Sequence, residues 1–125
     1  MHLDSKGNKK KRTVGFTFAL RGWKYAWKER NLRLQAVVAA FVLLMGVFFQ
    51  LATMEWIILV FVIGLVIAME MINTAVERLL DYLAPEFHPQ AGVIKDIAAG
   101  SVLAAAVAAA IIGAIIFLPR IVQLF

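Results

Sequence analysis

The sequence contains no cysteine. A disulfide framework, a zinc–thiolate site and a cysteine nucleophile are therefore excluded. Charged residues are also scarce, at 17% of the 125 residues, whereas soluble domains average about a quarter. Apolar residues make up 62% and occur in long runs, which leaves too little polar surface to cover a small water-soluble globule. The sequence predicts a single domain embedded in a membrane.

Basic residues become rare after residue 33, because ten of the thirteen Lys and Arg lie within residues 1–33. A basic arm beside a hydrophobic segment is typical of contact with anionic headgroups on the cytoplasmic side. Nucleic-acid binding is the rival interpretation of the arm, and the membrane-like remainder argues against it. A cleaved signal peptide does not fit, since the basic region is long and no small-residue cleavage site follows a short apolar stretch.

The expected fold is an all-α membrane protein with one interfacial helix and three transmembrane helices. Residues 1–12 are polar and basic, and we expect them to be flexible. Residues 13–30 interleave aromatic and basic side chains, which is typical of an amphipathic helix lying in the interface. Three apolar stretches then have the length of membrane spans, at about 31–52, 54–83 and 92–118, with Asn31 as the expected N-cap of the first span and Pro119-Arg120 as the expected end of the last.

The expected topology follows from the basic N-terminus, which we place in the cytoplasm. The turn at 50–55 then lies outside and the loop at 84–92 lies inside. Glu29, the end of the second span and Lys95-Asp96 all fall at the cytoplasmic edge. For Glu29 the simplest expectation is a local salt bridge to Arg33, four residues on.

An acidic stripe marks the second span. Glu70, Asn73, Glu77 and Asp81 share one helical arc about 80° wide. A carboxylate inside a membrane helix costs at least several kcal/mol, so it rarely lies there without a function. The sequence therefore predicts a site on this stripe.

The stripe has the groups that phosphoryl transfer needs. Glu29 and Glu77 are candidate ligands of Mg²⁺, which takes one or two carboxylates together with substrate phosphates. Lys95 can neutralise phosphate charge, and Glu70, the deepest and least solvated acid, suits a general base. No Walker A sequence, kinase-type Gly-rich loop or Rossmann fingerprint occurs. The residues alone leave three interpretations open: a catalytic site, an ion pathway of a small transporter, and a structural or regulatory subunit with paired interfacial charges.

A longer pattern resembles a known family. Its residues are Glu70-x-x-Asn73-Thr74-Ala75-x-Glu77, then Asp81, His88 and Lys95-Asp96-Ile97-Ala98-Ala99-Gly100, with Glu29-Arg30-Asn31 and Glu55-Trp56 upstream. The pattern is similar to that of the small bacterial integral-membrane lipid kinases, the prokaryotic diacylglycerol kinase and undecaprenol kinase family. The resemblance implies a homotrimer in the bacterial cell membrane with active sites built between subunits. It also implies ATP as co-substrate with Mg²⁺.

The resemblance further implies roles for individual residues. Glu70 matches the family's proton acceptor, and Glu29 and Glu77 match its metal- and ATP-contacting acids. The remaining matches are Lys95 and Asp96 as a nucleotide-contacting pair, Glu86, Phe87 and His88 as a loop near the nucleotide, and Asn73 with Asp81 as supporting residues. A lone loop histidine such as His88 is, on composition alone, more often exposed than a ligand.

The identity of the lipid substrate is the most specific expectation from the sequence. Asn73-Thr74, Glu29-Arg30-Asn31 and Phe117-Leu118-Pro119 resemble the Gram-positive branch, which favours undecaprenol, and diacylglycerol is the alternative. A cation- or proton-coupled transport subunit is the expectation from another class. It would place its acid near the bilayer midplane and show repeat symmetry, whereas these acids cluster toward one end and no internal repeat is visible.

Overall fold

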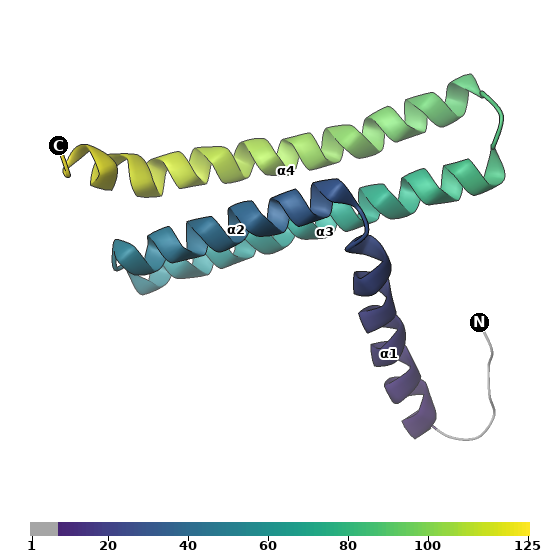
Figure 1. The fold of residues 1–125 in the computed structure, drawn as a ribbon, viewed down its shortest axis with the longest axis horizontal. Helices are drawn as coiled ribbons and strands as arrows, with labels where there is room; N and C mark the ends of the chain where they lie inside the picture. The colour runs from purple at the N-terminus through teal and green to yellow at the C-terminus, as the bar shows by residue number, and fades with distance from the viewer. Residues whose placement is uncertain (1–7) are drawn as a thin grey trace.

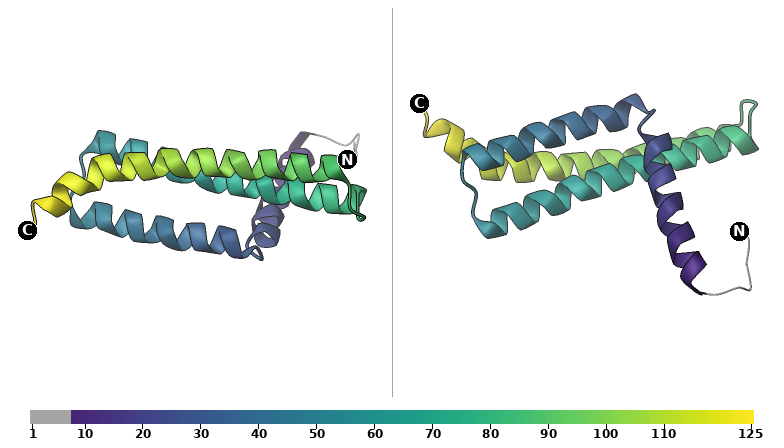
Figure 2. Two further views of the ribbon diagram at one scale, coloured as in Figure 1. Left: turned by 90° about the horizontal axis from the view of Figure 1, so that it is seen from above. Right: turned by 60° about the horizontal axis from the view of Figure 1, so that its bottom comes forward.

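Four helices make up the computed structural model, which describes residues 8–125, with side chains from residue 15 onward. They are α1 (Asn8–Ala26), α2 (Arg30–Phe48), α3 (Thr53–Leu83) and α4 (Pro89–Val122). Helices α2, α3 and α4 lie side by side, and α1 leaves this bundle at a steep angle from the start of α2 (Figures 1 and 2). The main packing interface joins α3 to α4, and α2 lies against α3.

Helices α2, α3 and α4 are each long and apolar enough to cross a membrane. With 19 residues, α2 is about 28 Å long and matches a bilayer core of about 30 Å. With 31 residues, α3 is about 46 Å long. Its last turns therefore extend beyond the start of α2, toward the end of the bundle where α1 and the α3–α4 loop lie (Figure 1).

The start of α2 differs from the expectation. Glu29, in an extended conformation (φ −76°, ψ 127°), is the N-cap residue, and Asn31 lies inside the first turn. The expected cap at Asn31 is therefore wrong, because the chain leaves the turn after α1 two residues earlier, with the Glu29 N–H bonded to the Ala26 carbonyl at 2.9 Å. At its other end α2 stops at Phe48, before the expected residue 52, since Gln50 adopts a left-handed conformation (φ 53°) in the turn to α3.

Helix α4 is longer than expected at both ends. Pro89 is its first residue, a position where the fixed φ of proline suits a helix, and the His88 ring caps it by accepting a hydrogen bond from the Gln90 N–H at 3.1 Å. At the other end the helix continues through Pro119 to Val122. The expectation that Pro119-Arg120 ends the helix is therefore wrong. The Arg120 side chain donates to the Ile116 carbonyl at 2.7 Å, which supports the turn that contains the proline.

Helix α1 begins earlier than expected. The predicted flexible segment 1–12 includes residues 1–7, which lie outside the described residues, and residues 8–12, which belong to α1. Helical backbone geometry does not test flexibility, so the expected flexibility of this segment stays a prediction. The helix ends at Ala26, where a turn leads to Glu29. Its aromatic side chains are exposed at Phe16, Phe18, Trp23 and Tyr25, and Trp27 in the turn that follows is exposed as well.

The buried hydrophobic cluster of the bundle lies at the end away from α1. Leu51, Leu59, Ile116 and Phe117 form a buried apolar cluster there. Beside it, Arg120 binds Glu55 through both of its terminal nitrogens, at 2.8 and 2.7 Å. The Glu55 carboxylate also accepts the Ala52 N–H at 3.1 Å. We call this arrangement the distal clamp, because it joins the α2–α3 turn, the start of α3 and the end of α4.

The close approach of α2 and α3 generates a prediction about stability. A Cβ added at Gly46 would lie 2.7 Å from the Trp56 ring and 3.1 Å from Leu51, so both side chains would have to move. We expect Gly46→Ala to lower the free energy of unfolding by about 1–3 kcal/mol, as overpacking does. Thermal unfolding in detergent measures the effect.

The matched control for this prediction is Gly64→Ala in the next helix. A Cβ at Gly64 meets nothing within 4 Å, so this variant should unfold at the wild-type temperature or above. Equal thermal midpoints for the two variants would contradict the close packing of Gly46.

Candidate active site

The acidic stripe begins at Glu70, beside the start of α2, and continues along the part of α3 that extends past it (Figure 1). Glu70 is only 4% exposed, and Asn73 and Thr74 are each 7% exposed. The carboxylates of Glu29 and Glu77 lie near enough for their charges to act on Glu70. The structure therefore brings together the predicted base and both predicted metal ligands, with Glu29 contributed by the α1–α2 turn and the other two acids by α3.

Asn73 connects the buried part of the stripe to the more exposed part. Its Nδ2 donates to Glu77 Oε1 at 3.3 Å. Its Oδ1 is buried, and no hydrogen-bond partner for it occurs among the residues that the structure describes. A buried acceptor without a donor costs about 1–3 kcal/mol. Asn73 therefore holds Glu77 in place and offers an amide oxygen to a further group.

Two cations lie against carboxylates of the site. Lys95 of α4 donates to Asp81 of α3 at 2.6 Å, which places the predicted phosphate-binding lysine at the outer end of the stripe. Arg78 forms an ion pair with Glu29 at 3.3 Å. The expected local salt bridge from Glu29 to Arg33 is therefore wrong: the partner of Glu29 comes from a different helix, because the turn after α1 lies against the last turns of α3.

The remaining predicted nucleotide contacts lie in and just after the α3–α4 loop. Glu86, Phe87 and Asp96 are exposed, and the His88 ring caps α4. The geometry of one chain does not gather these side chains around the three acids, and their contact with a nucleotide stays a prediction.

The donor set at the acids fits Mg²⁺. Within residues 15–125 no three His, Asp or Glu side chains form a complete metal-binding group. Two carboxylates, from Glu29 and Glu77, and the unpartnered Oδ1 of Asn73 are the oxygen donors present. Such an incomplete set suits Mg²⁺, which usually takes one or two carboxylates and completes its coordination with water and substrate phosphates.

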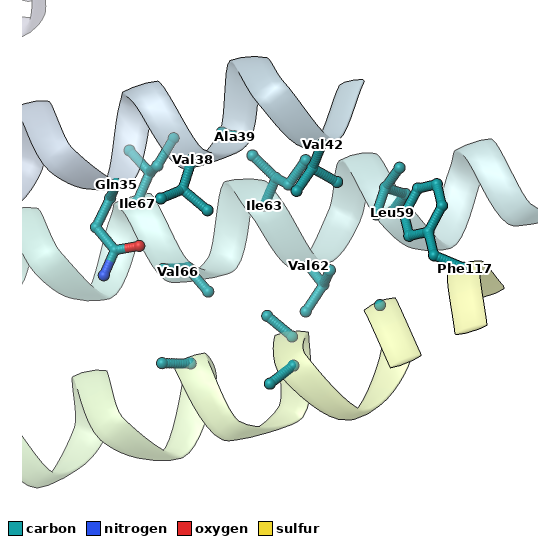
Figure 3. Close-up of a pocket in the computed structure, with 14 residues that line it drawn as sticks. Gln35, Val38, Ala39, Val42, Leu59, Val62, Ile63, Val66, Ile67 and Phe117 are labelled. Atoms are coloured by element: carbon teal, nitrogen blue, oxygen red, sulfur yellow. The ribbon is translucent and has the colours of Figure 1, made fainter. Parts of the chain in front are cut away.

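An apolar cavity of about 280 Å³ lies between α2, α3 and α4. Gln35 stands at one end, and Leu59 and Phe117 stand at the other (Figure 3). Val66 and Ile67, which also line the cavity, are about one turn before Glu70 on the same helix. The bundle therefore offers space for a hydrocarbon group next to the buried carboxylate.

The family model described as prokaryotic diacylglycerol kinase matches residues 17–117. The chain belongs to this family. It is 41% identical over 107 residues to the undecaprenol kinase of Bacillus subtilis, covering 85% of this chain and 87% of that protein. It is also 34% identical to the diacylglycerol kinase of Synechocystis, covering 89% of this chain and 65% of that one. The diacylglycerol kinase of Escherichia coli K12 is 26% identical over 107 residues, which cover 79% of this chain and 88% of that protein.

These matches confirm the family inferred from the Glu70 to Lys95 pattern. They also confirm that the chain is an enzyme of a bacterial kinase family, with three helices suited to span a membrane. Kinase chemistry implies the use of ATP as phosphoryl donor.

Two ion pairs were not predicted from sequence, one at the site and one at the opposite end of the bundle. The Arg78–Glu29 pair was missed because a four-residue spacing offered Arg33 as a nearer partner. The signal for it was the isolated charge of Arg78 among the acids of α3. The distal clamp was missed because Glu55 and Arg120 lie far apart in sequence, although the expected topology places both at the same membrane face.

The unpartnered oxygen of Asn73 leads to a prediction that separates function from stability. Asn73→Leu removes a buried acceptor that has no donor, so the thermal midpoint should stay unchanged or rise. Kinase activity should fall at least about tenfold, because Glu77 loses its hydrogen-bond donor and the site loses an amide oxygen. Thermal unfolding and lipid phosphorylation are measured on the same detergent-solubilised sample.

Thr74→Val provides the control, as a substitution of similar shape at a buried neighbour on the same helix. It should retain more activity than Asn73→Leu. A large loss of thermal stability in Asn73→Leu would show that Asn73 serves the fold and not the site.

Proposed function

We propose that the protein is a membrane lipid kinase that transfers the γ-phosphate of Mg-ATP to the hydroxyl of a membrane alcohol, most specifically undecaprenol. The observation that carries the proposal is the burial of Glu70 beside Glu29 and Glu77, next to an apolar cavity. A lipid alcohol has a hydroxyl group and a hydrocarbon chain. In this part of the bundle the hydroxyl can lie beside the Glu70 carboxylate, and the chain can occupy the apolar cavity.

Each residue of the site has a defined task in the proposal. Glu70 accepts the proton of the attacking hydroxyl. Glu29 and Glu77 hold Mg²⁺, which neutralises charge on the transferring phosphoryl group when bound. Lys95 leaves Asp81 to bind phosphate oxygens. The supporting tasks are the orientation of Glu77 by Asn73 and of Lys95 by Asp81, and nucleotide contact by Glu86, Phe87, His88 and Asp96.

The proposal also includes the setting of the site. Helix α1 lies in the membrane interface, because its exposed aromatic rings suit the headgroup region and its basic residues suit anionic lipid. The N-terminus and the site face the cytoplasm, where ATP is present. The functional unit is a homotrimer with sites between subunits, as the resemblance of the sequence pattern implies. Exposed nucleotide residues such as Phe87 and Asp96 then meet the acids of a neighbouring chain.

Undecaprenol is preferred over diacylglycerol as the substrate. The support is the 41% identity to the undecaprenol kinase of Bacillus subtilis, over nearly the whole of both chains. Relatives named as diacylglycerol kinases have lower identity, at 34% and 26%. The identity of the lipid is the most specific part of the proposal, and the first experiment tests it.

Purified protein in mixed micelles should consume ATP only when a lipid alcohol and Mg²⁺ are both present. Undecaprenol and diacylglycerol are offered separately, and the phosphorylated lipid is quantified. We expect faster turnover with undecaprenol. Faster turnover with diacylglycerol would reverse the substrate assignment, and absence of turnover with either lipid in folded protein would contradict the kinase proposal.

Glu70→Gln tests the proposed base. The amide has nearly the same shape as the carboxylic acid but cannot accept the hydroxyl proton, so turnover should fall at least about a hundredfold. Binding of Mg–ATP should change little, because Glu29 and Glu77 remain. Activity near that of the wild type would exclude Glu70 as the base, whereas loss of the folded oligomer, checked by size-exclusion chromatography, would show a structural role.

A further inference from the structure

The Arg78 side chain of α3 forms hydrogen bonds with the α1–α2 turn. Its Nη2 lies 3.3 Å from Glu29 Oε1 and 3.3 Å from the Tyr25 carbonyl oxygen. Tyr25 lies in the last turn of α1, and Glu29 is the N-cap of α2. One nitrogen of α3 therefore contacts both ends of the turn.

We propose that Arg78 is a positioning residue for Glu29: it fixes the α1–α2 turn against α3, so that the Glu29 carboxylate lies beside Glu70 and Glu77 before a metal–nucleotide binds. The proposal rests on the proposed function, in which Glu29 is a ligand of the metal. It assigns a role to Arg78, a residue outside the sequence pattern on which that function was built.

The α1–α2 turn depends on Arg78 because α1 itself packs little against the bundle. Helix α1 leaves the bundle at a steep angle (Figures 1 and 2), and among the described residues the larger helix interfaces join α3 with α4 and α2 with α3. Ala26 and Leu32, on either side of the turn, are buried. Apolar contacts thus keep the turn near the bundle, while the hydrogen bonds of Arg78 fix the direction of the Glu29 side chain.

Electrostatic interactions also support a role for Arg78 in holding Glu29 near the other acids. The charge of the Glu29 carboxylate acts on Glu70, and without a counterion this repulsion would favour a Glu29 side chain turned away toward water. Arg78 opposes this movement. The Arg78 and Glu29 side chains are 48% and 41% exposed, and ion pairs as exposed as this one are weak. The pair is therefore strong enough to orient Glu29 and weak enough to let a divalent cation take over the carboxylate.

The first experiment measures binding of Mg–AMP-PCP, a non-hydrolysable ATP analogue, by calorimetry in micelles. Arg78→Gln should weaken binding about tenfold, the lower end of the effect of removing a partner that orients a metal ligand. Arg78→Lys should recover part of the loss, because it keeps the charge but has no fork of donors. Arg33→Gln removes the same charge near the same turn and should change binding less than about twofold. Equal losses in Arg78→Gln and Arg33→Gln would overturn the proposal, since net charge alone would then explain both.

A double-variant comparison distinguishes positioning from direct phosphate contact. If Arg78 acts through Glu29, Arg78→Gln should have no further effect on Mg–AMP-PCP binding in a Glu29→Gln background. Additive losses would show that Arg78 binds the phosphates itself and would overturn the positioning role.

A third measurement uses the metal-free protein. Because the chain has no cysteine, Leu20→Cys and Leu83→Cys introduce two unique labelling sites at exposed positions on α1 and at the end of α3. Electron paramagnetic resonance then gives the distance distribution between two spin labels. The distribution should be broader with Arg78→Gln than with Arg78 intact, and equal widths would overturn the proposal. This readout needs no nucleotide, so failure of the wild-type protein to bind Mg–AMP-PCP would count against the proposed function and leave the test of Arg78 intact.

Discussion

The mismatch in length between α3 and the bilayer is the constraint on which the rest of the structure depends. Helix α2 has 19 residues and α3 has 31, whereas about 20 residues cross the hydrocarbon core. The surplus of α3 carries Glu77, Arg78 and Asp81, and Glu70 lies just inside. A carboxylate placed there is shielded from water by packing and still lies within reach of groups from the aqueous side. A shorter helix would leave the acids either in lipid or in water.

The two ends of the bundle are held by different kinds of interaction. The distal clamp combines a bidentate ion pair with caps on two backbone groups, beside the buried apolar cluster. At the site end, single contacts join exposed side chains, Arg78 to Glu29 and Lys95 to Asp81. Segments with few buried contacts open at low free-energy cost. Under the proposed function, the distal clamp lies away from the site, and the carboxylates and cations that would change partners are joined by single, solvent-exposed contacts.

Hydrophobic run length and the i, i+3, i+7, i+11 spacing of the acids allowed the three long helices and the acidic stripe to be predicted from sequence. The family pattern was specific because Glu70, Asn73 and Glu77 share one face of a helix that is otherwise apolar. Helix ends were harder to predict. The cap at Glu29, the cap by His88 and the passage of α4 through Pro119 depend on local backbone geometry that competes with simple propensity. The Arg78–Glu29 and Arg120–Glu55 pairs depend on which helices are neighbours. No spacing rule within one helix contains that information.

The distal clamp also has a consequence for biosynthesis. Glu55 and Arg120 are 65 residues apart, so Glu55 is made, and enters the membrane region, long before its partner has been translated. Until the last helix is inserted, the carboxylate at the start of α3 has only the Ala52 N–H of its own turn as a donor. The Glu55–Arg120 ion pair can therefore form only after both α3 and α4 have been inserted. A chain that stops before Arg120 would leave an uncompensated acid at the membrane surface, a feature that quality-control proteases could recognise.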